Sequence, residues 1–362
     1  MIQQPLPDEY RSLSPDDTDV RIADARKLLG EKLVVLGHHY QRDEIIRHAD
    51  YTGDSFKLSR LAASRTEAEF IVFCGVHFMA ESADVLSAEH QKVILPNLSA
   101  GCSMADMAEI HQVTECWEAI TSVCPTGTVP ITYINSAANL KAFVGRAGGT
   151  VCTSSNTPAA FRWGFQRGDR ILFFPDEHLG RNTGVKLGVP LDQMPVWDPD
   201  ADEMGGLTAD QIRSAKVILW KGYCSVHGRF NVKQIQLARR AHPNVKVVVH
   251  PECRMEVVQA ADFDGSTERI IQLISQSPPG SEWAVGTEIN LVNRLQQQHP
   301  DKLVFCLDPI VCPCSTMYRI HPHYLLWALE NLVRGRVVNQ VKVPPEESHW
   351  ARVALDRMLS IQ

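Results

Sequence analysis

The sequence predicts an α/β fold in which short parallel sheets recur in three copies along the chain. Short apolar runs alternate with amphipathic segments, which is the pattern of parallel α/β structure. A stretch near the start recurs near the end in one register, and polar residues follow the apolar runs at matching positions. The chain has 362 residues, 44% of them hydrophobic, which is enough for two or three compact units.

Seven apolar runs are the expected strands, and all are short and rich in β-branched or aromatic residues. They are LVVLG (33–37), FIVFCG (70–75), VPITYI (129–134), RILFFP (170–175), KVILW (216–220), VKVVVH (245–250) and KLVFCL (302–307). Helical patterns such as SFKLSRLAA and FNVKQIQLARRAH lie between them, several preceded by residues suited to N-capping.

An internal repeat relates the first part of the chain to the last. HHYQRDEIIRHADYTGDS aligns with HPECRMEVVQAADFDGST when His38 is set against His250. At this one offset, without gaps, further positions coincide: Ala49 with Ala261, Asp50 with Asp262, Gly53 with Gly265, and Cys102 with Cys314. A looser middle copy runs from TYINSAANLKAFV to GYCSVHG and contains an insertion. A repeat of this length indicates a repeated structural unit.

The repeat defines the expected domains. They are 1–105 with Cys102, 106–225 with Cys224 and an insertion near 186–212, and 226–319 with Cys314. The C-terminal helices of 320–362 are expected to pack on the first domain.

Composition and charge narrow the class of function. The formal net charge is -6 and the pI about 6.2, which disfavours nucleic acid as a partner and favours a small-molecule substrate. The polar, acidic start and the absence of long apolar runs predict a soluble, cytoplasmic protein without a membrane partner. Ten cysteines in a reducing compartment indicate metal binding, catalysis or burial rather than a disulfide framework.

Cys102, Cys224 and Cys314 are the candidate metal ligands because they occupy the same position in the three copies. The register selects Cys314 over its neighbour Cys312. Any one of them alone would more often be a buried small hydrophobe. If the carboxyl ends of the strands converge, three thiolates suit either zinc with an open position or an iron-sulfur cluster with one iron free of cysteine.

Each copy also places a polar pair one residue apart just after a strand, where alternate side chains share a face. The pairs are His38 and Tyr40, Tyr133 and Asn135, and His250 and Glu252. Hydrogen-bonded strand ends are the alternative interpretation. Three such pairs are hard to explain by folding alone, because desolvated polar groups need partners.

Small hydroxyl residues precede several amphipathic helices. Ser55, Ser154, Ser266 and Thr267 are candidate N-caps, and they are also suited to hold phosphate or carboxylate at a helix N-terminus. His227 follows Cys224 by three residues, a spacing that allows both to face the edge of one metal site or allows a supporting hydrogen bond.

The motifs HHYQ, GDS, GVHFMAE, GCSMAD, YINS, CTSSN, GYCSVH, HPEC, DGST and VGTE, in this order, resemble the quinolinate synthase (quinolinate synthetase A) family over nearly the whole chain. The resemblance implies three pseudo-symmetric three-layer α/β/α domains around a central active site. It implies one 4Fe-4S cluster held by Cys102, Cys224 and Cys314, with the fourth iron open. It also implies condensation of iminoaspartate with dihydroxyacetone phosphate to give quinolinate, phosphate and water in de novo NAD biosynthesis.

This resemblance assigns expected roles. The open iron would act as a Lewis acid for dehydration, and Glu252 would be the general base, with its pKa raised by burial and by the cluster's negative charge. Tyr40, Tyr133 and His227 would assist proton transfer. The residues expected to bind substrate are His38, Ser55, Tyr133, Asn135, Ser154, His250, Glu252, Ser266 and Thr267.

Other interpretations remain. The chain could be a non-catalytic iron-sulfur sensor or electron-transfer protein, although such a cluster normally has four protein ligands and little need for strand-end His, Tyr and Glu. A zinc hydrolase is a second alternative. Functional coupling to the enzyme that makes iminoaspartate is a possible partnership. Cys306 and Cys312 do not match the C-x-x-C-x-x-C of some family members, so a regulatory disulfide is not expected.

Overall fold

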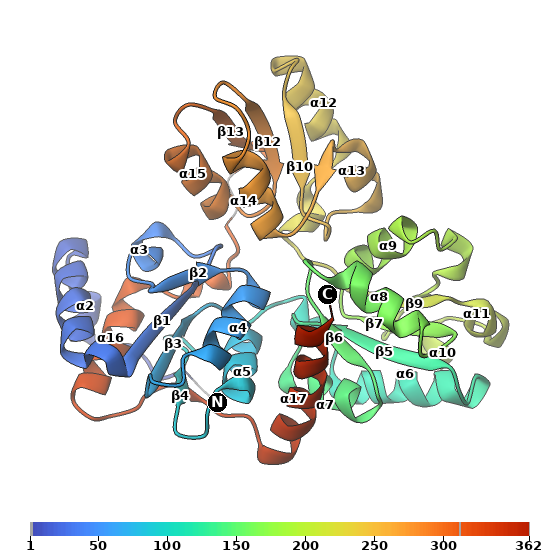
Figure 1. Ribbon diagram of the computed structural model, residues 1–362, viewed down its shortest axis with the longest axis horizontal. Helices are drawn as coiled ribbons and strands as arrows, with labels where there is room; N and C mark the ends of the chain where they lie inside the picture. Colours follow the sequence, from blue (N-terminus) through green and yellow to red (C-terminus); the bar gives the residue numbers. More distant parts are fainter. Residues whose placement is uncertain (1–2, 311–312, 362) are drawn as a thin grey trace. The chain divides into compact units, whose positions relative to one another are not determined.

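The computed structural model describes residues 3–310 and 313–361, which fall into two compact units. The first unit contains the N-terminal part of the chain up to residue 102 together with 313–344. The second contains 103–310 and returns at the C-terminus with 345–361. Each unit is α/β, as predicted, and its sheets are short and mainly parallel (Figure 1).

The first unit is built on one sheet with the strand order β14-β4-β3-β1-β2. Its strands are β1 (Leu33–His38), β2 (Tyr51–Gly53), β3 (Phe70–Cys74), β4 (Lys92–Ile94) and β14 (Gln340–Val341). All neighbours pair in parallel except β14, which runs antiparallel to β4. Every residue of β1 and β3 is buried, because helices cover a parallel sheet on its faces and its strands read as continuous apolar runs.

Helices α3, α4 and α5 pack against this sheet, and α16 packs on α2. The helices of this unit are α1 (Asp8–Arg11), α2 (Pro15–Leu29), α3 (Asp43–Ile46), α4 (Ser55–Ser64), α5 (His77–Leu86) and α16 (Pro322–Val333). Two 3-10 turns, η1 (Gly30–Lys32) and η5 (Met317–Arg319), complete it.

The second unit contains two sheets. One has the order β6-β5-β7-β9-β8, and the other has the order β11-β10-β12-β13; all pairs are parallel. The strands of the former are β5 (Thr128–Tyr133), β6 (Thr150–Cys152), β7 (Arg170–Phe174), β8 (Val196–Trp197) and β9 (Val217–Trp220). Those of the latter are β10 (Lys246–Val249), β11 (Phe263–Asp264), β12 (Glu282–Gly286) and β13 (Leu303–Cys306).

The helices α7, α8 and α9 pack on the β5–β9 sheet, and α15 packs on β13 of the other sheet. The helices of this unit are α6 (Ile110–Val123), α7 (Ala138–Arg146), α8 (Thr157–Phe165), α9 (Glu177–Lys186), α10 (Asp202–Gly205), α11 (Ala209–Ser214), α12 (Val232–Ala241), α13 (Met255–Ala260), α14 (Thr267–Ser275), α15 (Ile289–Gln298) and α17 (Pro345–Ser360). Its 3-10 turns are η2 (Ala105–Met107), η3 (Leu191–Gln193) and η4 (His227–Arg229).

The three sheets share one topology. In each, the first strand in sequence lies between the second and the third, so the orders β2-β1-β3-β4, β6-β5-β7-β9 and β11-β10-β12-β13 correspond; β14 and β8 are additional edge strands. The first and third copies also agree in detail. Asp50 accepts the N–H of Val35 at 2.7 Å, and Asp262 accepts the N–H of Val247 at the same distance. The repeat inferred from the sequence thus reappears as repeated topology.

The C-terminal segment differs from the expectation that all its helices pack on the first domain. Helix α16 lies in the first unit, but α17 packs on α7 and β6 of the second. Gly145 of α7 allows this close approach, because a Cβ built there would lie 2.0 Å from the carbonyl oxygen of Trp350. Arg357 reinforces the contact by donating to the carbonyl oxygens of Gly145 and Gly149.

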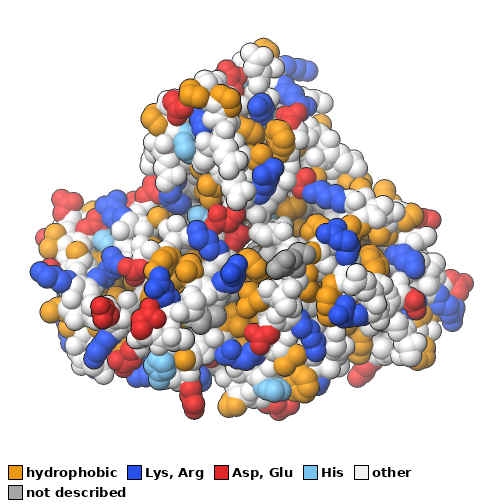
Figure 2. All heavy atoms as spheres, in the orientation of Figure 1, with side chains coloured by type: hydrophobic (Ala, Val, Ile, Leu, Met, Phe, Trp, Pro, Cys, Tyr) orange, Lys and Arg blue, Asp and Glu red, His pale blue; other side chains and the backbone are white. Residues whose placement is uncertain are grey.

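Surface properties agree with the composition. Figure 2 shows Lys and Arg side chains interspersed with Asp and Glu side chains over the face that it presents, in line with the net charge of -6. Among the described residues, no helix combines the length and the apolar character required to cross a bilayer.

Candidate active site

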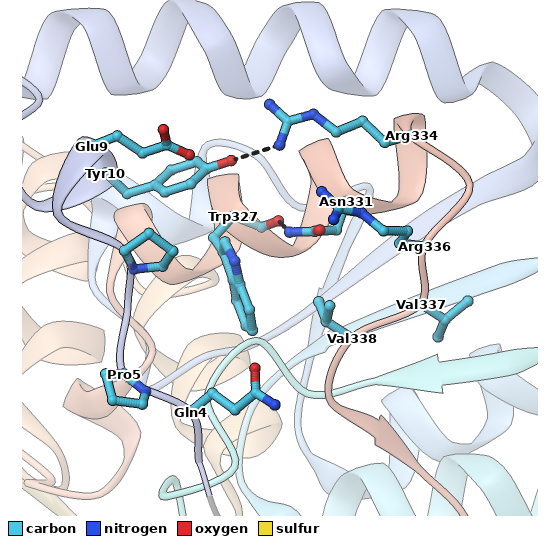
Figure 3. Close-up of a pocket in the computed structure, with 11 residues that line it drawn as sticks. Gln4, Pro5, Glu9, Tyr10, Trp327, Asn331, Arg334, Arg336, Val337 and Val338 are labelled. Atoms are coloured by element: carbon cyan, nitrogen blue, oxygen red, sulfur yellow. Dashed lines mark hydrogen bonds between the residues drawn. The ribbon is translucent and has the colours of Figure 1, made fainter.

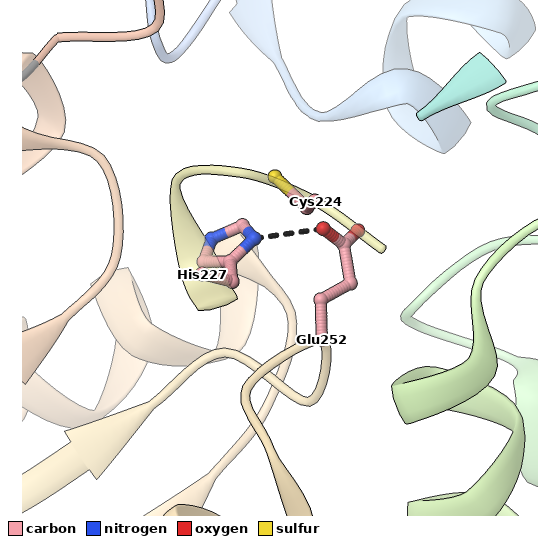
Figure 4. Close-up of side chains that lie close together, drawn as sticks. All are labelled: Cys224, His227 and Glu252. Carbon is pink, nitrogen blue, oxygen red and sulfur yellow. Dashed lines mark hydrogen bonds and ion pairs between the residues drawn. The ribbon is translucent and has the colours of Figure 1, made fainter. Parts of the chain in front are cut away.

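A buried hydrogen-bond network in the second unit centres on Glu252. The hydroxyl of Tyr133 donates to Oε1 of Glu252 at 2.6 Å, and Nδ1 of His227 lies 2.7 Å from Oε2. Figure 4 shows the imidazole and the carboxylate pointing toward one another, with Cys224 beside them. Tyr133, His227 and Glu252 are each at most 4% exposed. The network therefore lies in a desolvated setting, where its electrostatic interactions are stronger than in water.

Three different elements bring these residues together. Tyr133 is the last residue of β5, His227 opens η4 after the β9 strand, and Glu252 sits in the turn that follows β10. All three follow the carboxyl end of a parallel strand, which is where α/β sheets place ligand-binding residues. Tyr133, His227 and Glu252, which the sequence analysis selected, are therefore neighbours in space.

The two histidines of the network stack on one another. The rings of His227 and His250 lie 4.3 Å apart at an interplanar angle of 15°. Burial and the neighbouring His227 lower the pKa of His250 to about 3, so its ring is neutral near pH 7. Thr287 completes the surroundings, because its hydroxyl lies 3.2 Å from Nε2 of His227.

The pKa of Glu252 contradicts the expectation from the sequence. Burial does act to raise it, but the adjacent His250 and His227 and the hydrogen bonds from His227 and Tyr133 outweigh burial and lower the pKa of Glu252 to about 2. The carboxylate is therefore ionised over the physiological range. Because an ionised carboxylate can only accept hydrogen bonds, His227 must carry a hydrogen on Nδ1.

A second carboxyl group, which the sequence analysis did not single out, lies near Glu252. Asp176 is fully buried, and its side chain accepts the N–H of Leu179 at 2.6 Å as the N-cap of α9. Burial and the negative charge of Glu252 raise the pKa of Asp176 well above its usual value. The two neighbouring carboxyl groups thus have opposite pKa shifts, an arrangement that occurs in sites that handle protons.

Cys224 belongs to the same cluster. Its Sγ and ligand atoms of His227 and Glu252 all lie within 4.8 Å of one another, which is close enough for one metal ion to contact all three. Cys224 is half-buried, as are Cys102 and Cys314. In each case a 3-10 turn of three residues begins three positions after the cysteine. The three candidate ligands therefore share a local backbone setting as well as a sequence register.

In the first unit, the segments that carry Cys102 and Cys314 are tied together. Asn97 donates to the carbonyl oxygen of Arg319 at 2.9 Å, and Arg319 donates to that of Ser99 at 2.7 Å. These two hydrogen bonds join the segment just before Cys102 to the segment just after Cys314. Cys312 lies outside the described residues.

The first unit also holds the strand-end pair of the first repeat. His38 lies at the end of β1 and is buried, whereas Tyr40 is half-buried. Their rings meet edge to face with centroids 4.8 Å apart. Gln41, the next residue, is fully buried and donates to the carbonyl oxygen of Met317 in η5 at 3.1 Å. The HHYQ motif thus supports the loop that contains Cys314.

The hydroxyl residues before the helices are placed as follows. Ser266 is the N-cap of α14 and accepts the N–H of Arg269, while Thr267 is the first residue of that helix. Ser55 is not a cap, because Asp54 caps α4 in its place. Ser154 lies in the turn before α8, two residues ahead of Asn156 at the N-cap position.

Asn135 has a buried Oδ1 atom for which the described residues supply no hydrogen-bond partner. Such an unsatisfied acceptor costs free energy unless a ligand or water fills the position. This observation supports a ligand-binding role for the YINS motif.

The remaining cysteines are less suited to metal binding. Five of them are buried: Cys74, Cys116, Cys124, Cys152 and Cys253. Burial raises the pKa of Cys74 and of Cys152 to about 12, which keeps both thiols protonated near neutral pH. Cys306 is half-buried, and burial raises its pKa to about 11.

A separate hollow of about 590 Å³ occurs in the first unit between α1 and α16 (Figure 3). Tyr10, Trp327 and Arg334 are among the residues that line it. The Tyr10 hydroxyl accepts from Arg334 at 3.4 Å and donates to Glu330 at 2.8 Å, so these groups are engaged in structural contacts. None of the residues selected from the sequence lines this hollow.

The sequence analysis missed Thr287 and Asp176 as members of the site. Both lie in motifs visible in the sequence, VGTE and FFPDEHLG. Their position after strands β12 and β7 could have indicated them, because these are the same strand ends that carry the other polar residues.

Comparison with known proteins gives one consistent result. The family model described as quinolinate synthetase A protein matches residues 21–360. A quinolinate synthase of Corynebacterium glutamicum is 58% identical over 360 residues, covering 99% of this chain and 91% of that protein. A quinolinate synthase of Acidobacterium capsulatum is 57% identical, covering 98% of this chain and 96% of that protein. One of Rhodopirellula baltica is 52% identical, covering 98% of this chain and 93% of that protein.

Proposed function

The chain belongs to the quinolinate synthetase A family, and on that basis we propose that it condenses iminoaspartate with dihydroxyacetone phosphate to form quinolinate in de novo NAD biosynthesis. Phosphate and water are the other products, and the enzyme is a transferase that forms a carbon-carbon bond. The observation that carries the proposal is the buried Tyr133–Glu252–His227 network beside Cys224. A non-catalytic metal protein would have little use for such a network.

A 4Fe-4S cluster fits the residues that are present. Cys102, Cys224 and Cys314 would hold it, since all three are half-buried and precede a 3-10 turn by the same spacing. Three thiolates leave one iron open, and that iron would supply a Lewis acid for the dehydration steps. The reciprocal Asn97–Arg319–Ser99 contact supports the joint placement of the Cys102 and Cys314 loops.

The protein's own groups would move protons around the substrates. Glu252 is ionised and accepts from Tyr133 and His227, so it fixes the orientation of both donors. Because its pKa is low, Glu252 is a weak base near pH 7, so in proton transfer it would act mainly by orienting Tyr133 and His227 and by stabilising positive charge that develops beside it.

Substrate carboxylates and the phosphate need donors and oriented dipoles. Ser266 and Thr267 stand at the N-terminus of α14, where backbone N–H groups favour anions. Asn135 offers its unsatisfied Oδ1 to a hydroxyl or imine N–H of the substrate. His38, Ser55, His250 and Ser154 would complete the substrate-binding set, and Tyr40 would assist proton transfer.

Location and partnership follow from this chemistry. Iminoaspartate hydrolyses readily in water, so coupling to the enzyme that makes it would be advantageous. A cytoplasmic location is proposed because a chain with ten cysteines, three of them candidate thiolate ligands, is suited to a reducing compartment. Neither nucleic acid nor membrane has a part in the proposed function.

The first test is anaerobic reconstitution with iron and sulfide. We expect about four irons and four sulfides per chain and quinolinate formation that depends on them. Cys102→Ser, Cys224→Ser and Cys314→Ser should each abolish the cluster absorbance and the activity.

Two matched variants serve as controls. Cys306→Ser alters a cysteine that is also half-buried, and Cys312→Ser alters the near neighbour of Cys314. Both should retain the cluster. Loss of the cluster in Cys312→Ser with retention in Cys314→Ser would refute the ligand assignment, and stoichiometric zinc with no iron would refute the cluster itself.

A further inference from the structure

We propose that helix α9 (Glu177–Lys186) holds Glu252 and the loop containing Cys224 in a fixed relative position, and that Asn182 is the positioning residue. We call this helix the bracket. This inference rests on the proposed function, because it concerns how the same site is kept in its working geometry. The FFPDEHLGRNTG segment supplies the bracket. It holds one loop through its N-terminal end and the other through the middle of the helix.

Asn182 clamps the turn that carries Glu252. Its Nδ2 donates to the carbonyl oxygen of Pro251 at 2.9 Å and to that of Cys253 at 2.8 Å. These two carbonyl groups flank Glu252 on either side along the chain. Asn182 is 4% exposed, so water does not compete for either hydrogen bond. One amide group therefore fixes the backbone of the turn at two points.

The N-terminal end of α9 holds the cysteine loop. The N–H of Glu177 donates to the carbonyl oxygen of Gly222 at 2.8 Å, two residues before Cys224. The approach is close, because a Cβ built on Gly222 would lie 2.3 Å from the carbonyl oxygen of Pro175. Only glycine fits there without displacement of the loop.

The bracket is itself anchored to its sheet. Gly180 packs so tightly that a Cβ there would lie 2.4 Å from Phe173 of β7 and 2.5 Å from Leu219 of β9. At the C-terminal end of α9, Lys186 forms an ion pair with Asp264 of β11. The helix thus connects the β5–β9 sheet to the β10–β13 sheet, which carry the two halves of the network.

Small displacements matter in this geometry. The contact between Glu252 and His227 is 2.7 Å, and a shift of about 1 Å would lengthen it beyond hydrogen-bond range. A misplacement of this size can lower turnover by roughly 10²-fold. A bracket that prevents it acts on catalysis without touching a substrate.

A purely structural role is the competing explanation, and Asn331 provides the control for it. Asn331 is 5% exposed, lies in a helix of the other unit and donates from Nδ2 to the carbonyl oxygen of Trp327 at 2.7 Å. Asn182→Leu and Asn331→Leu both remove a buried amide from a helix at similar size. Only Asn182→Leu removes hydrogen bonds to the turn that carries Glu252.

The first measurement uses metal-free protein, so that cluster loading does not enter. Hydrogen exchange of the peptide covering 250–255 should accelerate about tenfold or more in Asn182→Leu and stay at the wild-type rate in Asn331→Leu. With iron and sulfide restored to equal content, Asn182→Leu should lose about tenfold or more in kcat with a smaller change in KM. Asn331→Leu should retain the wild-type kcat.

Two results would overturn the inference. One is unchanged exchange at 250–255 in Asn182→Leu, and the other is an equal loss of kcat in both variants. Failure of the proposed function would look different, because the wild-type enzyme itself would then form no quinolinate while the exchange result could still hold.

Discussion

The strand ends of the first and third repeats have the same backbone but different chemistry. In the first repeat the N–H of Tyr40 lies 3.1 Å from Nδ1 of His38, and in the third the N–H of Glu252 lies 3.3 Å from Nδ1 of His250. The residue after each pair donates its N–H to the carbonyl oxygen of the histidine, at 2.9 Å for Gln41 and 3.0 Å for the equivalent cysteine. The two turns are thus copies of one structure.

The side chain two positions after the histidine makes the difference. Tyr40 packs edge to face on its histidine and is half-buried. Glu252 is buried, accepts hydrogen bonds from Tyr133 and His227 and has its pKa lowered. The comparison teaches that the repeat fixes where a side chain is presented, whereas its neighbours, here His250 of the same turn with His227 and Tyr133 of other elements, determine its pKa.

The largest expected effect tests this difference directly. Glu252→Gln keeps size and hydrogen-bonding capacity but removes the negative charge, so it should retain the cluster and lose about 10²-fold or more in turnover. Tyr40→Phe, at the equivalent position, should lose no more than about tenfold, because the change removes one hydroxyl group and no charge. The measurement is steady-state quinolinate formation at matched iron content.

The comparison would fail if the two variants lost equal activity, since the charge of Glu252 would then have no special part. Full activity in Glu252→Gln would move the proton-transfer role to Tyr133 or His227.

Acid should weaken the third repeat. The pKa of His250 is lowered to about 3 in the folded protein, whereas an unfolded histidine titrates near 6.5, so the unfolded state binds more protons between these values. Stability from this group is therefore complete above pH 6.5 and declines as the pH falls toward 3. Glu252, with a folded pKa of about 2, adds a further decline below about pH 4.5.

His250→Gln should remove the decline between pH 6.5 and 4.5, which we expect to be about 1–3 kcal/mol in wild-type protein. The measurement is hydrogen exchange of β12, the strand beside β10, in metal-free protein at several pH values. Equal pH dependence in the wild type and the variant would show that His250 is not the responsible group.

Much of the fold could be predicted from the sequence because its signals are local. The apolar runs mark strands whose two faces are buried, and the constant offset between His38 and His250 reveals the repeat before any contact is known. The histidine, tyrosine and glutamate positions follow from the same register.

What could not be predicted depends on contacts between distant segments. The pKa of Glu252 is lowered by His250, two positions away, and also by His227 and Tyr133, which lie 25 and 119 positions away in the chain. The packing of α17 on α7 depends on the close approach allowed by Gly145, and nothing near 345–360 indicates it. The hydrogen bonds from Asn182 to the turn of Glu252 could not be predicted either, because they join residues 69 and 71 positions apart.

The smallest expected effect concerns the part that the two repeats share. Asp50 and Asp262 accept the N–H of Val35 and Val247, and they pair with Arg26 and Arg239. An asparagine at either position could still accept the backbone N–H but would lose the ion pair, and partly exposed ion pairs contribute little.

Asp50→Asn and Asp262→Asn should therefore each lower the free energy of unfolding by about 1 kcal/mol or less, by nearly equal amounts, and leave kcat unchanged. Hydrogen exchange of β1 and of β10 reports the two repeats separately, so each variant serves as the other's control. A loss several times larger in one repeat would show that the shared backbone is supported differently in the two copies. Equal small losses would place the whole functional difference in the side chains at Tyr40 and Glu252, because the supporting turns would then be energetically as well as geometrically alike.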